Sequence, residues 1–275
     1  MKFQLTKYPA LNSFILIILF FGAALFMVGF IDNPFLRRYF PFTSVVLLII
    51  ATWFLLRIDN KSFKYLGLNI SIRNLSFLPL GLLIGAVAFL LAKYLRGLYT
   101  GEAFEITSSD INYSTILLGF YWLLPSVAVE EFLFRGYAFK KAIEVSNVTV
   151  ANIIFAILFM LVHVLDRGVM QNKATVLFFL ITIPIGHLLF ATALLKSKTL
   201  FFPIGIHLGN NWATQHLITK YNNGDSIFFI PESTTFETWT PFIILIIIWN
   251  LFYLIVVYVI WKWDRIANYW IRKFK

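Results

Sequence analysis

Long apolar stretches alternate with short polar loops along the whole chain. A helix needs about 20 predominantly apolar residues to cross a bilayer. Eight segments approach this length: 12–31, 41–57, 75–95, 114–134, 148–165, 175–195, 200–219 and 241–261. The fourth is expected to continue as helix past Arg135 to about Ile143. The pattern predicts an all-α fold, a polytopic membrane helix bundle of about eight transmembrane helices, forming one integral membrane domain of residues 1–275.

The composition agrees with a membrane protein and removes several classes of function. Hydrophobic residues make up 60% of the chain and charged residues 13%, whereas a soluble domain is about half apolar and a quarter charged. The absence of cysteine excludes disulfides, thiol catalysis and thiolate metal sites. The net charge of +10 comes from basic residues in loops and the C-terminal tail. We therefore expect the lipid bilayer as a partner, and no nucleic acid.

The positions of the basic residues predict the orientation in the membrane. If the N-terminus is inside, 16 of the 23 Lys and Arg residues fall in inner segments. The seven on the outer side are Arg37, Arg38, Lys93, Arg96, Arg167, Lys173 and Lys220. Cytoplasmic loops carry an excess of Lys and Arg, so both termini are predicted to be cytoplasmic. The expected location is the bacterial plasma membrane.

The third predicted span contains a pair of glycines at the spacing that brings membrane helices together. Gly81 and Gly85 are four residues apart, so they lie on one face of a helix. Small residues at this spacing let two helix backbones approach closely. We interpret this pair as a packing feature and not as part of a reactive site.

Two adjacent glutamates and an arginine occur inside apolar sequence at residues 130–135. A charged side chain at the centre of a membrane helix costs about 2.5–3.5 kcal/mol on insertion scales, and such residues mark functional sites by default. Glu131 and Arg135 share a helix face, with the acid first, which is the favourable order for an ion pair. Glu130 points about 100° away and lacks that partner, so it is the candidate general base. The alternative is a buried ion network that only locks two helices together.

Two histidines occur in later apolar segments, each with a companion one helical turn away. Phe159 precedes His163 by one turn and is expected to form an apolar wall beside it or, alternatively, to pack against lipid. Asn211 follows His207, and both side chains can donate hydrogen bonds to a developing oxyanion. The alternatives are a satisfied interior histidine at 163 and a polar clamp between helices at 207 and 211.

Helix lengths place the three polar groups at similar depths. Counted from the predicted cytoplasmic ends at about 1.5 Å per residue, Glu130, His163 and His207 lie roughly 20, 24 and 16 Å deep. This agreement is compatible with one shared site. The sequence has no His-Glu-x-x-His zinc motif, Gly-x-Ser-x-Gly elbow or Walker loop, which would indicate other chemistries.

Three motifs in this order resemble a known family of membrane proteins. They are Glu-Glu-x-x-x-Arg at 130–135, Phe-x-x-x-His at 159–163 and His-x-x-x-Asn at 207–211. This pattern is similar to that of the CAAX protease and bacteriocin-processing family (CPBP, or Abi), which includes the type II CAAX prenyl endopeptidases. The resemblance covers roughly residues 63–215. It implies an all-helical intramembrane protease.

The resemblance also implies roles for the motif residues. Glu130 and His163 would activate a water molecule, His207 and Asn211 would stabilise the oxyanion, and Glu131 and Arg135 would orient the site. The implied substrate is a membrane protein or peptide, and no cofactor is expected. A zinc ion held by Glu130, His163 and His207 is the alternative.

Two other functions remain possible for the same motifs. Some members of the family are associated with scaffold or bacteriocin self-immunity roles, which imply a non-catalytic protein of the same fold. A proton-coupled transporter that uses Glu130 is less favoured, because no inverted repeat or pair of broken spans is seen in the sequence.

Overall fold

The computed structural model describes residues 9–108 and 110–273, and the side chains of 11–108 and 110–265. The basic residues Lys2, Lys7 and Lys275, which contribute to the predicted orientation, lie outside the described residues. The helices are α1 (Pro9–Ile31), α2 (Pro34–Tyr39), α3 (Thr43–Ile58), the 3₁₀ turn η1 (Phe63–Leu66), α4 (Ile72–Thr100), α5 (Tyr113–Phe134), α6 (Tyr137–Val145), α7 (Val148–Val164), α8 (Arg167–Met170), α9 (Lys173–Ser197), α10 (Phe201–Trp212), the π turn η2 (Ala213–Leu217) and α11 (Trp239–Lys273).

The all-α membrane bundle is confirmed, and the protein is an integral membrane protein. Five described helices are long and apolar enough to cross a bilayer, and α3 and α7 are shorter apolar helices. The count of about eight spans is not confirmed, because the predicted span 200–219 is divided. It forms α10, η2 and the short strand β2 (Ile218–Thr219).

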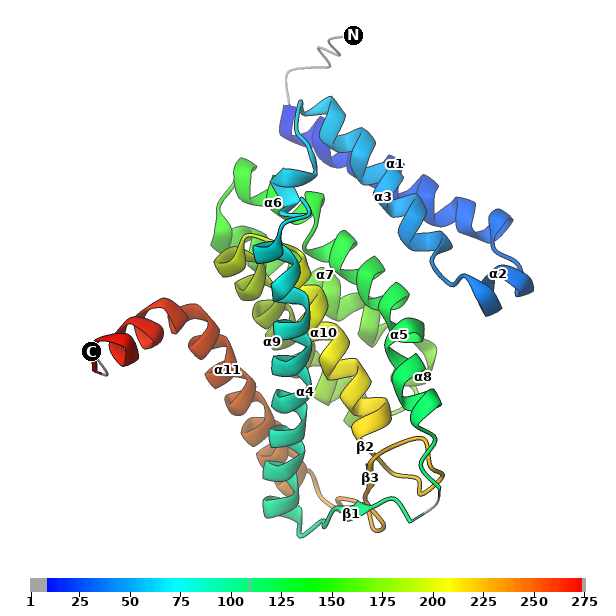
Figure 1. Cartoon of the computed structure of the whole chain (residues 1–275), viewed down its shortest axis with the longest axis vertical. Helices are drawn as coiled ribbons and strands as arrows, with labels where there is room; N and C mark the ends of the chain where they lie inside the picture. The colour runs from blue at the N-terminus through cyan, green and yellow to red at the C-terminus, as the bar shows by residue number, and fades with distance from the viewer. Residues whose placement is uncertain (1–8, 109, 274–275) are drawn as a thin grey trace.

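The strands lie together at one end of the bundle, which we call the strand end. β1 (Glu105–Ile106) pairs antiparallel with β3 (Phe228–Phe229), and β3 pairs parallel with β2. Figure 1 shows this end at the bottom and α6 at the opposite end, which we call the α6 end. The segments at the α6 end hold most of the basic residues that the sequence places inside.

Polar residues begin the helices that form the centre of the bundle. The side chains of Ser71, Asn112, Asn147 and Asn172 each accept a hydrogen bond from a backbone N–H in the first turn of the helix that follows. Because the first four N–H groups of a helix have no partner within it, these caps stabilise each helix start. They therefore fix where α4, α5, α7 and α9 begin.

The helix predicted to run unbroken past Arg135 is interrupted there. α5 ends at Phe134, and α6 starts at Tyr137. Gly136 has ψ −138°, and a Cβ at this position would lie 2.2 Å from the carbonyl oxygen of Phe132. Only glycine fits this turn, so the expectation of a continuous helix to Ile143 is wrong at this point.

Glycines bring α4 and α10 into backbone contact, as the spacing of Gly81 and Gly85 predicts. A Cβ at Gly85 would lie 2.0 Å from the carbonyl oxygen of Ile206. On α10, a Cβ at Gly205 would lie 2.3 Å from the carbonyl oxygen of Leu78, and one at Gly209 would lie 2.1 Å from that of Leu82. Side chains larger than hydrogen would push the two helices apart.

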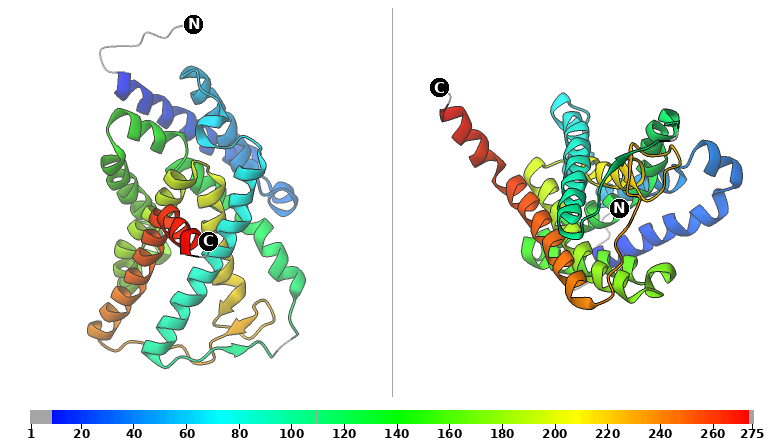
Figure 2. Two further views of the ribbon diagram at one scale, coloured as in Figure 1. Left: turned by 60° about the vertical axis from the view of Figure 1, so that its left-hand side comes forward. Right: turned by 90° about the horizontal axis from the view of Figure 1, so that it is seen from below.

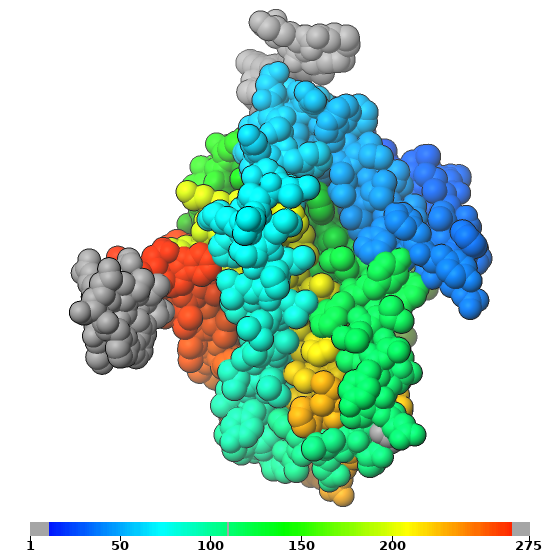
Figure 3. Space-filling view, viewed as in Figure 1, coloured from blue at the N-terminus to red at the C-terminus, as the bar shows by residue number. Residues whose placement is uncertain are grey.

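This contact makes α10 the central helix of the bundle. Every residue from Phe202 to Gly209 is buried, and a helix that is apolar and buried all round belongs to a protein interior. In the space-filling view only a narrow strip of α10, in yellow, is visible between α4 and α5 (Figure 3). Figure 2 shows α1 and α3 on one side of this centre and α11 on the other. His207 is therefore held inside protein and not against lipid.

Candidate active site

Glu130 lies between the two predicted histidines. Its Oε2 atom is 3.8 Å from Nε2 of His163 and 3.8 Å from Nε2 of His207. These residues come from three different helices, α5, α7 and α10. The separations are too long for direct hydrogen bonds, and a water molecule can bridge polar groups at such distances. The three groups are thus close enough to share one site.

Glu131 faces the other way and connects Arg135 with His207. Its Oε1 atom accepts a hydrogen bond from Nη1 of Arg135 at 3.3 Å and lies 2.8 Å from Nδ1 of His207. The side chains of Glu131 and Arg135 are fully buried. The i, i+4 pair predicted from the sequence is therefore present, and it also orients the imidazole of His207.

Two aromatic rings enclose the guanidinium of Arg135. The ring centroid of Phe159 lies 4.0 Å from its Cζ atom, and that of Phe190 lies 4.9 Å away. Phe190 also stacks on His207, with centroids 4.5 Å apart. Cation–π attraction strengthens when the cation is removed from water. Phe159 thus forms the predicted apolar wall, and Phe190 is a supporting residue that the motif spacing did not indicate.

The backbone of α7 fixes the orientation of His163. Its Nδ1 atom is 2.8 Å from the carbonyl oxygen of Phe159. A carbonyl oxygen only accepts hydrogen bonds, so Nδ1 carries the hydrogen. In the neutral ring Nε2 is then left with its lone pair, directed toward Glu130. His163 is therefore arranged to act as a base at Nε2.

These groups open into a cavity of about 470 Å³, which we call the central cavity. Its polar lining includes Glu130, His163, His207 and Asn211, so all four predicted catalytic residues face one space. Half of the remaining lining residues are aromatic, and the lining comes from α4, α7, α9, α10, η2 and α11. A volume of this size, with an apolar lining and a few convergent polar groups, is typical of a ligand-binding site.

The last helix contributes more to the site than the sequence indicated. Trp249 and Tyr253 of α11 line the central cavity. The hydroxyl of Tyr253 accepts a hydrogen bond of 2.7 Å from Nδ2 of Asn210. Their helix lies outside the motif region, and aromatic residues in a membrane span are ordinarily read as lipid-facing or packing residues.

The other two described histidines, His187 and His216, take packing positions. His187 is fully buried beside Phe139, with ring centroids 5.6 Å apart. His216 lies 2.9 Å from the backbone carbonyl oxygen of Asp225 and against Gly119. Neither residue lines the central cavity.

The zinc alternative gains no support from the described residues. No group of three or more His, Cys, Asp or Glu side chains in this part of the chain has the arrangement of a metal site. Asn211, which completes the polar lining, is a poor zinc ligand. The metal-free mechanism is not tested by this observation and stays a prediction.

The fold and the site define an integral membrane protein with a buried glutamate–histidine cluster inside a helix bundle. Residues 112–213 match the family described as Rce1-like, type II CAAX prenyl endopeptidase Rce1-like. Residues 112–213 are thus similar to this family, which confirms the predicted resemblance over this segment. No curated protein and no solved structure matches the chain.

The family match covers less of the chain than the predicted 63–215. It includes every predicted site residue, from Glu130 to Asn211. It leaves out α4 and α11, which also line the central cavity. The walls of the cavity thus come partly from the matched segment and partly from helices outside it.

Proposed function

We propose that this protein is an intramembrane glutamate-type endopeptidase. It hydrolyses a peptide bond of a membrane-associated protein or peptide within the central cavity. The observation that carries the proposal is the position of Glu130, whose Oε2 atom is 3.8 Å from Nε2 of both His163 and His207 inside an apolar bundle. A carboxylate in a membrane span is energetically costly, and such residues mark functional sites by default.

Glu130 and His163 are suited to activate the attacking water. Both side chains are about one-quarter exposed, so they reach the cavity without lying in open solvent. Oε2 of Glu130 has no hydrogen-bond partner among the described residues. A water molecule between Glu130 and His163 can transfer its proton to one of them as its oxygen attacks the substrate carbonyl.

His207 and Asn211 are suited to stabilise the oxyanion that this attack creates. Donation from Nε2 of His207 needs a hydrogen on that atom. The other ring nitrogen, Nδ1, lies 2.8 Å from Oε1 of Glu131, and this contact orients the imidazole. The side-chain amide of Asn211 supplies the second donor from one turn further along α10. Fixed donors in a water-poor cavity lower the barrier most effectively.

The basic residues at the α6 end favour an orientation with this end in the cytoplasm. With the α6 end in the cytoplasm of a bacterial cell, both termini are cytoplasmic and the strand end faces outward. His163 lies at the last turn of α7, which runs toward the strand end. The exposed Thr214 and Gln215 of η2 also line the central cavity, on its strand-end side. Substrate therefore reaches the site from the outer part of the membrane.

Replacement of Glu130 tests the proposal directly. The variant Glu130→Gln should reduce peptide-bond hydrolysis by about 10²–10⁴-fold, because a general base contributes this much. The measurement compares membrane peptidomes of cells that express the wild type, Glu130→Gln, or the control Glu144→Gln on the exposed surface of α6. If the Glu130→Gln variant cleaves as well as the wild type, Glu130 is not the general base.

The same comparison separates the peptidase from a non-catalytic scaffold or self-immunity protein. A scaffold would keep its cellular phenotype in the Glu130→Gln variant, and no peptide would accumulate with the wild type. Metal analysis of the purified, active protein tests the remaining alternative. Stoichiometric zinc, with activity lost on chelation, would replace the metal-free mechanism.

A further inference from the structure

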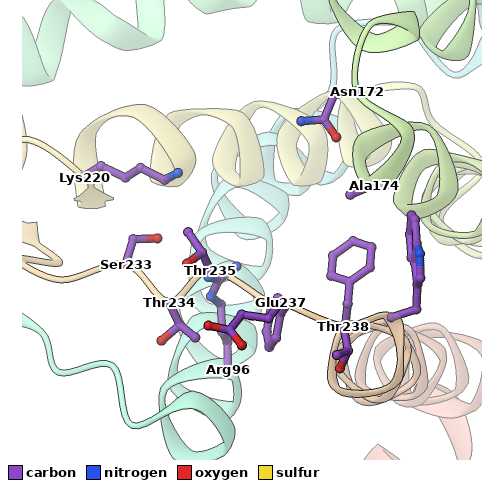
Figure 4. Close-up of a pocket in the computed structure, with 12 residues that line it drawn as sticks. Arg96, Asn172, Ala174, Lys220, Ser233, Thr234, Thr235, Glu237 and Thr238 are labelled. Carbon is purple, nitrogen blue, oxygen red and sulfur yellow. The ribbon is translucent and has the colours of Figure 1, made fainter.

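A second cavity lies at the strand end, and we call it the end pocket. It has a volume of about 600 Å³ and lies between α4, the start of α9, the start of α11 and the segment 233–238. Figure 4 shows Arg96 beside Thr235 and Glu237, with Lys220 extending toward them from the left of the view. None of these residues belongs to the proposed catalytic group.

The end pocket and the central cavity lie on the same three helices. On α9 the lining residues Ala174 and Phe178 are one turn apart. On α11, Phe242 lines the end pocket and Trp249 the central cavity, about two turns away. The two cavities therefore follow one another along the bundle, and the end pocket is the outer one.

Lys93 on α4 lies between the two cavities. It comes four residues after Phe89, which lines the central cavity, and three before Arg96, which lines the end pocket. Its Nζ atom is 5.6 Å from the ring centroid of Phe89. Lys93 is also near enough to Arg96, Glu102 and Lys220 to interact electrostatically with them.

The direction of the Lys93 side chain argues against a simple interfacial role. Lysines near the ends of membrane helices usually extend toward the nearer interface. For Lys93 that interface lies toward the C-terminal end of α4. Its ammonium lies instead near Phe89, one turn nearer the N-terminus, and so points deeper into the bundle. This places a cation beside Phe89, a residue that lines the central cavity.

The neighbouring acid does not neutralise Lys93. Glu102 forms two hydrogen bonds of 2.7 Å with Arg96 and accepts a third, of 2.8 Å, from the backbone N–H of Thr234. Lys93 and Lys220 have no hydrogen bond or ion pair with any residue that the structure describes. An intramembrane cation without a partner is expected to serve a ligand.

We propose that Lys93 is a specificity residue that binds a carboxylate of the peptide substrate. The proposal rests on the peptidase function given above. The carboxylate is either the C-terminus of the peptide or an acidic side chain, since an ammonium recognises both in the same way. The end pocket holds the part of the peptide that extends outward from Lys93.

The spacing along α4 sets the position of this carboxylate in the substrate. Gly85 contacts Ile206 and Asn210 of α10, on either side of His207. Lys93 is eight residues further along α4, or about 12 Å. An extended peptide advances about 3.3 Å per residue. The recognised carboxylate therefore lies about two to four residues from the hydrolysed bond, with the reach of the lysine side chain included.

Peptide binding to an inactive protein tests the proposal without relying on cleavage. The full chain with Glu130→Gln is placed in nanodiscs of phosphatidylcholine, which carries no net charge. The probes are three apolar heptapeptides with a neutral fluorophore: one with a free C-terminus, one amidated with an internal Glu, and one amidated with Gln at that position. At least one of the two acidic peptides should bind about tenfold more tightly than the amidated Gln peptide.

Variants at Lys93 then assign this preference to one residue. Lys93→Met should remove the preference for the acidic peptide, and Lys93→Arg should keep most of it. Lys64→Met, at an exposed position of the α6 end, is the matched control and should keep all of it. Because Lys93→Met removes a charge from the membrane interior, its thermal stability should be no lower than that of the parent protein.

The outcomes distinguish a failure of the peptidase proposal from a failure of the Lys93 proposal. Equal binding of all three peptides, including no binding of any, would overturn the role of Lys93, as would a full preference in Lys93→Met. The wild-type protein is incubated with the same peptides as a separate measurement. Carboxylate preference without cleavage would contradict the peptidase, whereas cleavage without preference would contradict only the role of Lys93.

Discussion

Two polar clusters join distant parts of this chain, and they are built differently. The first, at the α6 end, consists of Asp59, Lys61, Tyr137, Lys141 and Glu144, and we call it the surface network. Oδ2 of Asp59 accepts hydrogen bonds of 2.6 Å from Lys141 and 2.8 Å from Tyr137, and Lys61 binds Glu144 at 2.6 Å. Each charged group there has a close partner of opposite sign.

The second cluster, around Glu130, leaves polar atoms unmatched inside the bundle. Oε2 of Glu130, Oε2 of Glu131, and Nε and Nη2 of Arg135 are buried without a hydrogen-bond partner among the described residues. A network that only fastened helices together would be expected to satisfy such atoms. The difference indicates that the surface network serves stability, whereas the candidate site leaves hydrogen-bonding atoms available for a bound ligand or water.

The largest expected effect on stability is at Arg135. Arg135→Met would leave the carboxylate of Glu131 buried without its cation, which should lower the free energy of unfolding by about 3–5 kcal/mol. The double variant Glu131→Gln/Arg135→Met removes both charges and should recover most of this loss. Chemical unfolding of the purified protein in detergent measures both. If the single and double variants are equally unstable, the ion pair does not explain the loss.

The next effect concerns activity and compares two asparagines. Asn211→Ala should lower kcat by about 10²–10³-fold, because it removes a proposed oxyanion donor. Asn152→Ala on α7 is the control, since the amide nitrogen of Asn152 donates to the backbone carbonyl of Val148 and the residue does not line the central cavity. Kinetics with any peptide that the wild type cleaves provide the measurement. Equal losses in the two variants would count against the role of Asn211.

The smallest effect is expected in the surface network. Burial raises the pKa of the Asp59 carboxyl, but the hydrogen bonds from Lys141 and Tyr137 lower this pKa by a larger amount. The pKa of Asp59 therefore lies below its usual value. A lowered pKa contributes stability above the unfolded value near 3.8, and this contribution is lost as the pH falls through the folded value. Asp59→Asn should therefore cost about 1 kcal/mol or less at neutral pH, because solvent screens the pair.

Unfolding measured between about pH 7 and pH 2 checks the Asp59 prediction. The wild type should lose its small advantage over Asp59→Asn only in the acidic part of this range, below about pH 4. An advantage that grows toward low pH would contradict the predicted sign. A loss of several kcal/mol at neutral pH would show that the surface network is not the weakly coupled cluster described above.

Much of the candidate site could be predicted because it depends on local spacing. The ion pair of Glu131 and Arg135 follows from the four-residue period of a helix, as does the position of Phe159 beside His163. The contact at Gly81 and Gly85 follows from side-chain size. The break at Gly136 was missed, because the apolar pattern of the sequence continues through it and only the backbone conformation shows why a glycine is needed.

The sequence by itself determined that this protein is a helical membrane protein with a few charged groups in its interior. Apolar length and the 3.6-residue period are local properties, and burial in lipid leaves few other solutions. Only the tertiary structure decided that α10 is enclosed by protein, that Phe190, Trp249 and Tyr253 help to form the central cavity, and that the ammonium of Lys93 lies near Phe89 in the wall of this cavity. These depend on how helices far apart in the chain pack together, because each side chain's surroundings come from other helices and not from its own sequence neighbours.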